Sequence, residues 1–116
     1  MKFKILLIDE NLKNFYSLQN FLEDALYTAS YCNNVVCAYR SIVVCRQKID
    51  IIILNATRAM KFYPLFLEEI RKKGINIPII MISSRSCAKV NGANYVTLRF
   101  FNLKKIKKHI DYIVNN

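Results

Sequence analysis

The sequence predicts a single α/β domain over residues 1–116, in which five parallel strands form a doubly wound sheet with helices on both faces. Short aliphatic runs without polar alternation, such as DIIILN at 50–55, are typical of strands that are buried on both faces. Segments with apolar residues at helical spacing separate these runs. Because crossovers between parallel strands are right-handed, the expected strand order is 2-1-3-4-5.

The first half of the chain contains two predicted strand–helix units, followed by the central strand. The expected elements are a strand over 4–8, a helix over 12–27, a short strand over 35–39, a helix over 41–48 and the central strand over 50–55. Asn11 and Ser41 are residue types that cap helix N-termini, and the Asn33–Asn34 pair is typical of a turn.

The second half repeats the alternation. A loop over 56–61 precedes a helix with Pro64 in its first turn and Gly74 at its C-terminal cap. The expected elements that follow are a strand over 78–82, a shortened fourth helix within 85–91, a strand over 95–98 and a last helix that Asn102 caps. No internal repeat or linker interrupts this pattern.

Composition and charge exclude several classes of protein. No apolar stretch approaches the roughly 20 residues of a membrane span, and Asp9–Glu10 interrupts the only signal-like start, so we expect a cytoplasmic protein without a membrane partner. Four cysteines lack the paired spacing of zinc sites, which indicates buried thiols. The net charge of +10 fits a nucleic-acid or acidic partner, and equally a lysine-rich composition throughout.

Polar side chains stand at the ends of the predicted strands. Asp9 and Glu10 follow the first strand, Asn55 ends the third, Ser83 follows the fourth and Arg99 follows the fifth. Because the carboxyl ends of parallel strands meet at the same edge of a sheet, we expect these five side chains to converge on one crevice.

Four segments, taken in this order, make the chain resemble the receiver domain of bacterial response regulators, a CheY-like and flavodoxin-like superfamily. The segments are ILLIDE at 5–10, DIIILN at 50–55, PIIMIS at 78–83 and GANYVTLRFF at 92–101. In that family an acidic pair and an aspartate on the third strand hold Mg²⁺, and this aspartate accepts a phosphoryl group from a histidine kinase. The resemblance covers essentially the whole chain and implies a role in two-component signal transduction.

Carried over residue by residue, the resemblance places Asp9 and Glu10 at the metal-binding pair and Ser83 at the switch hydroxyl. Asn55 takes the place of the phosphoacceptor aspartate, and Arg99 takes the place of the lysine that binds the phosphate. The structural alternative for the acidic pair, which we favour, is a polar strand end that pairs with Arg99.

Asn55 determines the predicted function. An amide cannot form an acyl phosphate, so the resemblance implies a degenerate, atypical receiver. Compared with the family's aspartate, Asn55 also removes one negative charge from the group of side chains that binds the metal. Mg²⁺ binding should therefore be weak or absent. We expect no resident cofactor and no enzymatic activity. Arg58 adds a second positive charge near the rim.

Two aromatic positions complete the predicted switch. The resemblance makes Tyr95 and Phe101 candidates for a rotating signal residue, although aromatic side chains at strand ends are more often part of a core or an interface. Domains of this family often form dimers, so the resemblance implies a homodimer through the fifth strand and the last helix, on a face that the shortened fourth helix alters.

The sequence therefore predicts a signalling or transcription-regulation module that acts by phosphorylation-independent protein–protein interaction, with a protein partner or an output domain. In a longer regulator the partner would include nucleic acid. The alternative is a basic module that binds nucleic acid or an acidic protein through the lysines of its last helix. If the lysines bind no partner, they form a solvated face of that helix. Its lysines are Lys104, Lys105, Lys107 and Lys108. A flavin binder of the same topology is disfavoured, because Asp9–Glu10 would repel its phosphate.

Overall fold

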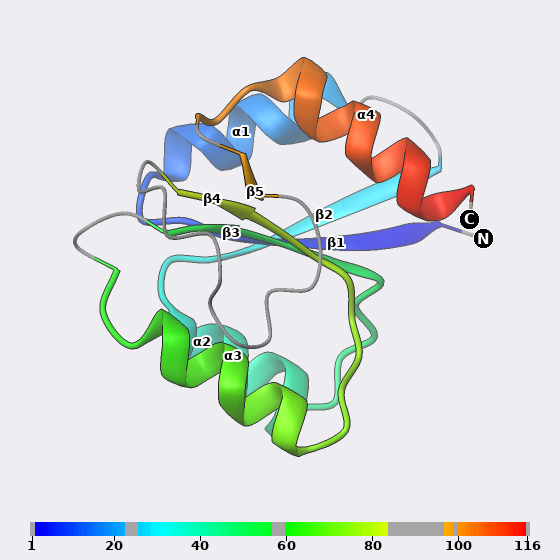
Figure 1. Cartoon of the computed structure of the whole chain (residues 1–116). Helices are drawn as coiled ribbons and strands as arrows, with labels where there is room; N and C mark the ends of the chain where they lie inside the picture. Colours follow the sequence, from blue (N-terminus) through cyan, green and yellow to red (C-terminus); the bar gives the residue numbers. More distant parts are fainter. Residues whose placement is uncertain (1, 23–25, 57–59, 84–96, 99, 116) are drawn as a thin grey trace.

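A parallel sheet between two helical layers makes up the described part of the chain (Figure 1). The computed structural model describes residues 2–22, 26–56, 60–83, 97–98 and 100–115. Helices α1 (Leu12–Phe21) and α4 (Leu103–Val114) cover one face of the sheet, and α2 (Val35–Tyr39) and α3 (Tyr63–Lys72) cover the other. None of the helices among these residues is long and apolar enough to cross a membrane.

The sheet has the strand order β2-β1-β3-β4-β5, and all neighbouring strands are parallel. The strands are β1 (Phe3–Ile8), β2 (Tyr27–Cys32), β3 (Ile51–Asn55), β4 (Ile79–Ile82) and β5 (Thr97–Leu98). The first four form the body of the sheet, and β5 is a two-residue stretch paired with the end of β4. The predicted parallel α/β class is confirmed. The predicted fourth helix within 85–91 and the first half of the predicted strand 95–98 lie outside the described residues.

Strands β1 and β3 lie in the middle of the sheet and contribute to both cores. Leu6 and Ile8 of β1 belong to the core beneath α2 and α3, whereas Ile5 and Leu7 belong to the core beneath α1 and α4. All four side chains are buried. This confirms that uninterrupted aliphatic runs in this sequence are strands covered on both faces.

The predicted second strand was wrong. Residues 35–39 are helix α2, which continues into a π-helical turn over Arg40–Val44, and the second strand is instead Tyr27–Cys32. Helix α1 therefore ends at Phe21 and does not extend to residue 27. Ser41, the predicted N-cap, lies inside the helical segment.

Two local interactions explain this difference. The side chain of Asn34 accepts a hydrogen bond from the backbone N–H of Cys37 at 2.8 Å, so Asn34 is the N-cap of a helix that starts at Val35. Residues 27–32 pair with β1 along its whole length, from Phe3 opposite Tyr27 to Ile8 opposite Cys32. Backbone pairing along an entire strand outweighs the local helical spacing that the sequence shows there.

Other predicted helix ends are confirmed. Asn11 accepts the backbone N–H of Lys13 at the start of α1, and Asn102 likewise caps α4. Gly74 has a φ of +77° after α3. Its N–H donates to Arg71 O and the N–H of Ile75 donates to Ile70 O, which is the hydrogen-bond pattern of a Schellman motif.

Candidate functional site

The fold brings Asp9, Asn55 and Ser83 to the carboxyl edge of three neighbouring strands. Asp9 directly follows β1, Asn55 is the last residue of β3, and Ser83 directly follows β4. Asp9 is 1% exposed and Ser83 is 5% exposed, and they are the two buried polar side chains among the described residues. The predicted convergence of the first, third and fourth strand ends is therefore observed.

The carboxylate of Asp9 accepts hydrogen bonds from three N–H donors. The backbone N–H of Asn11 donates to Oδ1 at 2.8 Å. The side-chain amides of Asn14, from α1, and Asn55, from β3, both donate to Oδ2, at 2.8 Å and 2.9 Å. A buried carboxylate is costly unless such donors compensate its charge. Asp9 is thus an internal anion that ties α1 to the ends of β1 and β3.

This arrangement fixes the orientation of the Asn55 amide. If the Oδ1 atom of Asn55 faced Asp9, two oxygen acceptors would meet without a proton between them. With Nδ2 towards Asp9, the amide donates a charge-assisted hydrogen bond instead. Asn55 therefore acts towards Asp9 as a donor.

The backbone of Asp9 is held from the β2 side. Its N–H donates to Cys32 O at 3.1 Å, and the hydroxyl of Tyr31 donates to Asp9 O at 2.6 Å. Burial raises the pKa of Tyr31, and the negative charges of Asp9 and Glu10 raise it further, so the hydroxyl is a donor. The sequence does not indicate Tyr31 or Asn14 as site residues. Tyr31 lies between the first predicted helix and the predicted second strand, and Asn14 lies within that helix without a distinguishing signal.

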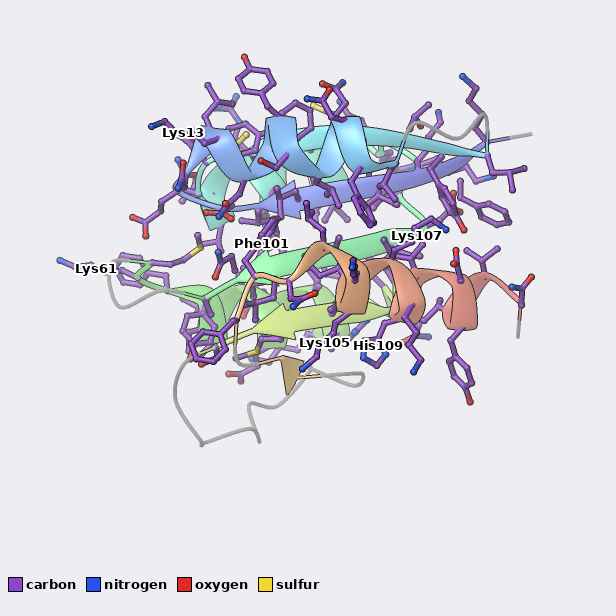
Figure 2. All side chains as sticks on the ribbon, turned by 90° about the horizontal axis from the view of Figure 1, so that it is seen from above. Lys13, Lys61, Phe101, Lys105, Lys107 and His109 are labelled. Atoms are coloured by element: carbon purple, nitrogen blue, oxygen red, sulfur yellow. The ribbon has the colours of Figure 1, made fainter. Side chains whose placement is uncertain are left out.

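The remaining predicted site residues are distributed differently. Glu10 is exposed, next to the buried Asp9. Phe101 is partly buried and packs against the core beneath α1 and α4 (Figure 2), which agrees with the core alternative for this residue. Arg58, Tyr95 and Arg99 lie outside the described residues, so the expected pairing of Arg99 with the acidic pair stays a prediction.

These residues do not fit a Mg²⁺ ion in the arrangement observed. Mg²⁺ takes oxygen ligands in near-octahedral geometry at about 2.0–2.1 Å. Both oxygens of Asp9 face N–H hydrogens, and Asn55 turns its nitrogen towards this carboxylate. Within the described ranges, no group of three or more His, Cys, Asp or Glu side chains is placed to hold a metal ion.

The four lysines of α4 differ in their exposure and in their contacts. Lys104, Lys105 and Lys108 are exposed. Lys107 lies on the side of α4 opposite Lys105 (Figure 2) and donates to Asp111 Oδ2 at 2.9 Å.

Lys107 belongs to a small structural cluster with β2. The hydroxyl of Tyr27 donates to Asp111 Oδ1 at 2.7 Å, and Lys107 Nζ lies 5.9 Å from the centre of the Tyr27 ring. The hydrogen bonds from Lys107 and from Tyr27 lower the pKa of Asp111. Lys107 therefore fastens α4 to β2 and is not part of the free basic surface.

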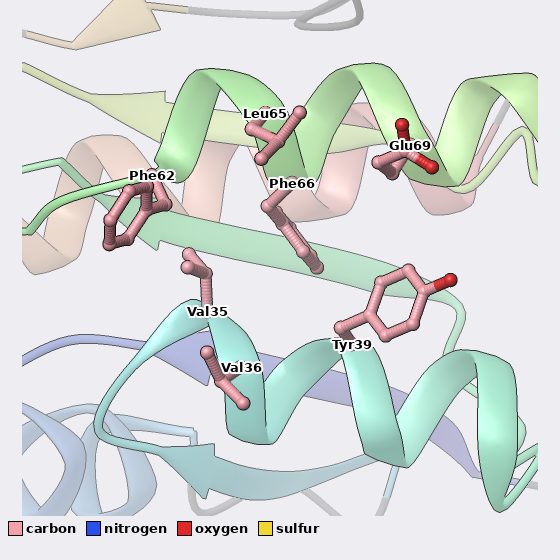
Figure 3. Close-up of a pocket in the computed structure, with 7 residues that line it drawn as sticks. All are labelled: Val35, Val36, Tyr39, Phe62, Leu65, Phe66 and Glu69. Carbon is pink, nitrogen blue, oxygen red and sulfur yellow. The ribbon is translucent and has the colours of Figure 1, made fainter.

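An apolar groove of about 170 Å³ lies between α2 and α3 (Figure 3). Its lining residues are Val35, Val36, Tyr39, Phe62, Leu65, Phe66 and Glu69. Phe62 is 66% exposed and has a φ of +64°, a left-handed conformation that is uncommon for an aromatic residue. Sequence reasoning missed this groove because it interpreted residues 35–39 as a strand.

No protein-family model matches the sequence, and neither does any curated protein. Solved structures do match. A two-component response regulator from Clostridium difficile superimposes with a TM-score of 0.81 at 20% identity, covering 99% of this chain and 98% of that chain. The response regulator TrrA from Thermotoga maritima, in complex with Mg²⁺-BeF, gives a TM-score of 0.74 at 21% identity, covering 97% and 99%.

A third similar structure is an orphan response regulator of H. pylori, with a TM-score of 0.72 at 15% identity, covering 97% of this chain and 96% of that chain. At these identities the likeness establishes the fold. The chain therefore has the α/β fold of response-regulator receiver domains.

Proposed function

We propose that this chain is a receiver-type module of two-component signalling or transcription regulation that acts by protein contact, without phosphotransfer to residue 55. The observation that carries the proposal is the hydrogen bond from Asn55 Nδ2 to the buried carboxylate of Asp9. The receiver fold supports the signalling class, and this contact supports the phosphorylation-independent mode.

The chemistry of the two side chains supports this mode. Phosphotransfer to a receiver needs a carboxylate oxygen as nucleophile, and the amide of Asn55 offers none. Asp9 is the buried carboxylate of the crevice, and its oxygens accept hydrogen bonds from Asn11, Asn14 and Asn55. The neutral amide of Asn55 stabilises the Asp9 carboxylate by donating a hydrogen bond, whereas a third carboxylate at this position would require a cation.

The expected partner is a protein. The chain works either as a free-standing adaptor in the cytoplasm or as the input domain of a longer regulator, and it has no catalytic role. A homodimer through the β5 and α4 side of the sheet stays part of the proposal.

A titration with Mg²⁺ and beryllofluoride, followed by amide NMR, tests the proposal. Wild-type protein should show no saturable shifts at Asp9, Asn55 or Ser83, because no carboxylate at position 55 is present to receive the mimic. Asn55→Asp is the matched variant, and shifts in this variant alone would show that only the acceptor is missing. Saturable shifts in the wild type would refute the proposal.

A second candidate function rests on the three exposed lysines of α4. Lys104, Lys105 and Lys108 carry positive charge on the surface of a chain with a net charge of +10. If they bind a nucleic-acid backbone, affinity should fall steeply with salt, because each neutralised phosphate releases counterions. Lys107→Gln is not informative here, since Lys107 is bound to Asp111. Binding that does not change between low and high salt would exclude this function.

A further inference from the structure

Two cysteine side chains meet where β2 ends and α2 begins. Cys32 is the last residue of β2, and Cys37 lies in the first turn of α2. Their sulfur atoms are 2.8 Å apart, with Cys37 Sγ donating to Cys32 Sγ, and both are free thiols. A disulfide has an S–S length of about 2.05 Å, so the two sulfurs need to approach by only about 0.8 Å.

We propose that Cys32 and Cys37 form a thiol-oxidation site, which closes to an intramolecular disulfide when the protein meets a hydroperoxide. The close approach of the two sulfurs in the folded chain carries this inference. The 2.8 Å between the two sulfurs is shorter than the separation of about 3–3.5 Å at which reacting atoms are poised for attack.

The two thiols have different surroundings, which assigns them different roles. Cys32 is 3% exposed, and its Sγ lies 3.8 Å from the hydroxyl of Ser41. Burial raises the pKa of the Cys32 thiol to about 12, so the free thiol of Cys32 reacts slowly with an oxidant. Cys37 is only partly buried and is therefore the sulfur that an oxidant reaches first.

The reaction balances with the hydroperoxide as the oxidant. The sulfur of Cys37 attacks the terminal peroxide oxygen, the O–O bond breaks, and the products are a Cys37 sulfenic acid and an alcohol, or water when the oxidant is hydrogen peroxide. The sulfur of Cys32 then attacks the sulfur of Cys37. The S–S bond forms, the S–O bond breaks, and the hydroxyl leaves as water with the thiol proton. Two electrons have passed from the sulfurs to the peroxide.

The position of the pair gives the disulfide a structural consequence. Cys32 O accepts the backbone N–H of Asp9, and Asn34 accepts the backbone N–H of Cys37. A covalent bond between the sulfurs would fix the first turn of α2 against the end of β2, beside the buried carboxylate of Asp9. The amide resonance of Asp9 therefore reports on oxidation.

Differential alkylation after treatment of the native full chain with hydrogen peroxide tests the site. Trypsin releases residues 14–40 as one peptide, which contains Cys32 and Cys37 and no other cysteine. This peptide should lose the mass of two hydrogen atoms and resist alkylation, and after reduction it should take up two alkyl groups. Cys45→Ser is the matched control, and it should leave this result unchanged because Cys45 is exposed and outside the pair.

Two variants assign the order of events. In Cys37→Ser the thiol of Cys32 should remain reduced, and in Cys32→Ala a dimedone adduct should accumulate on Cys37, because its sulfenic acid has no nearby thiol to react with. The same treatment in urea shows whether the fold supplies the proximity, and the native chain should form the bond at least tenfold faster. Full alkylation of both cysteines after peroxide, or equal rates in native and unfolded chains, would overturn the proposal.

Discussion

Replacing Asn55 with aspartate tests the role of the amide as a donor to Asp9. The substitution changes few atoms, but it removes the N–H that donates to Asp9 Oδ2 at 2.9 Å and puts a second carboxylate next to a side chain that is 1% exposed. Without Mg²⁺, we expect Asn55→Asp to fold with a markedly lower free energy of unfolding than the wild type.

The magnitude follows from two contributions. A hydrogen bond to a charged group contributes about 1.5–3 kcal/mol. Two unit charges about 4 Å apart repel by about 4 kcal/mol at an effective dielectric constant of about 20, and relaxation or protonation of the pair reduces this. We therefore expect a loss of about 3–5 kcal/mol at pH 8, which is a large part of the total stability of about 5–15 kcal/mol for a domain.

Urea unfolding followed by circular dichroism, at pH 8 with a chelator, measures this loss. Asn55→Ala is the control, because it removes the hydrogen bond without adding charge and should lose only about 1.5–3 kcal/mol. Added Mg²⁺ should restore stability to Asn55→Asp but not to the wild type, since ligand binding to the folded state adds RT ln(1 + [L]/Kd). The reasoning is refuted if Asn55→Asp without Mg²⁺ is as stable as the wild type within about 0.5 kcal/mol.

Three further substitutions test other parts of the fold. The pKa of Asp111 is lowered in the folded state, so the stability that its carboxylate contributes is present above the ordinary carboxyl pKa of about 3.9 and is lost on acidification. Thermal unfolding should therefore show a stability difference between wild type and Asp111→Asn that shrinks below that pH. Arg46 has a φ of +52°, so in chemical denaturation Arg46→Gly should be neutral or stabilising by up to about 1 kcal/mol, and a clear loss would contradict the assigned backbone conformation. Gly74→Ala should instead destabilise by about 1 kcal/mol in the same assay, although no atom lies within 4 Å of the added Cβ, because the φ of +77° is unfavourable for alanine.

The central strands and the helix caps at Asn11, Asn102 and Gly74 were predictable from the sequence because their signals are local. Four consecutive aliphatic residues at 51–54 are enough to indicate a strand buried on both faces. Asn11 and Asn102 cap their helices through their own side chains, and Gly74 adopts a conformation that other residues avoid.

The second strand could not be predicted in the same way because long-range pairing determines it. Only Tyr27 and Cys32 of residues 27–32 are buried, and the segment becomes a strand because β1 offers a full set of backbone partners. Because the predicted second strand is in the wrong place, the contacts of Tyr31 with Asp9 and of Cys32 with Cys37 cannot be predicted from the sequence either. The sequence predicts that Asp9 and Asn55 lie close together, and the structure shows which of their atoms face each other.

The most direct test of the account is the intact mass of the protein after incubation with a small phosphoryl donor and Mg²⁺. Acetyl phosphate or phosphoramidate serves as the donor, and Asn55→Asp is measured in parallel as the variant that regains a carboxylate. We predict that the wild type gains no phosphoryl group at residue 55. A phosphoryl group mapped to that residue in the wild type would contradict the proposal that the module works without phosphotransfer.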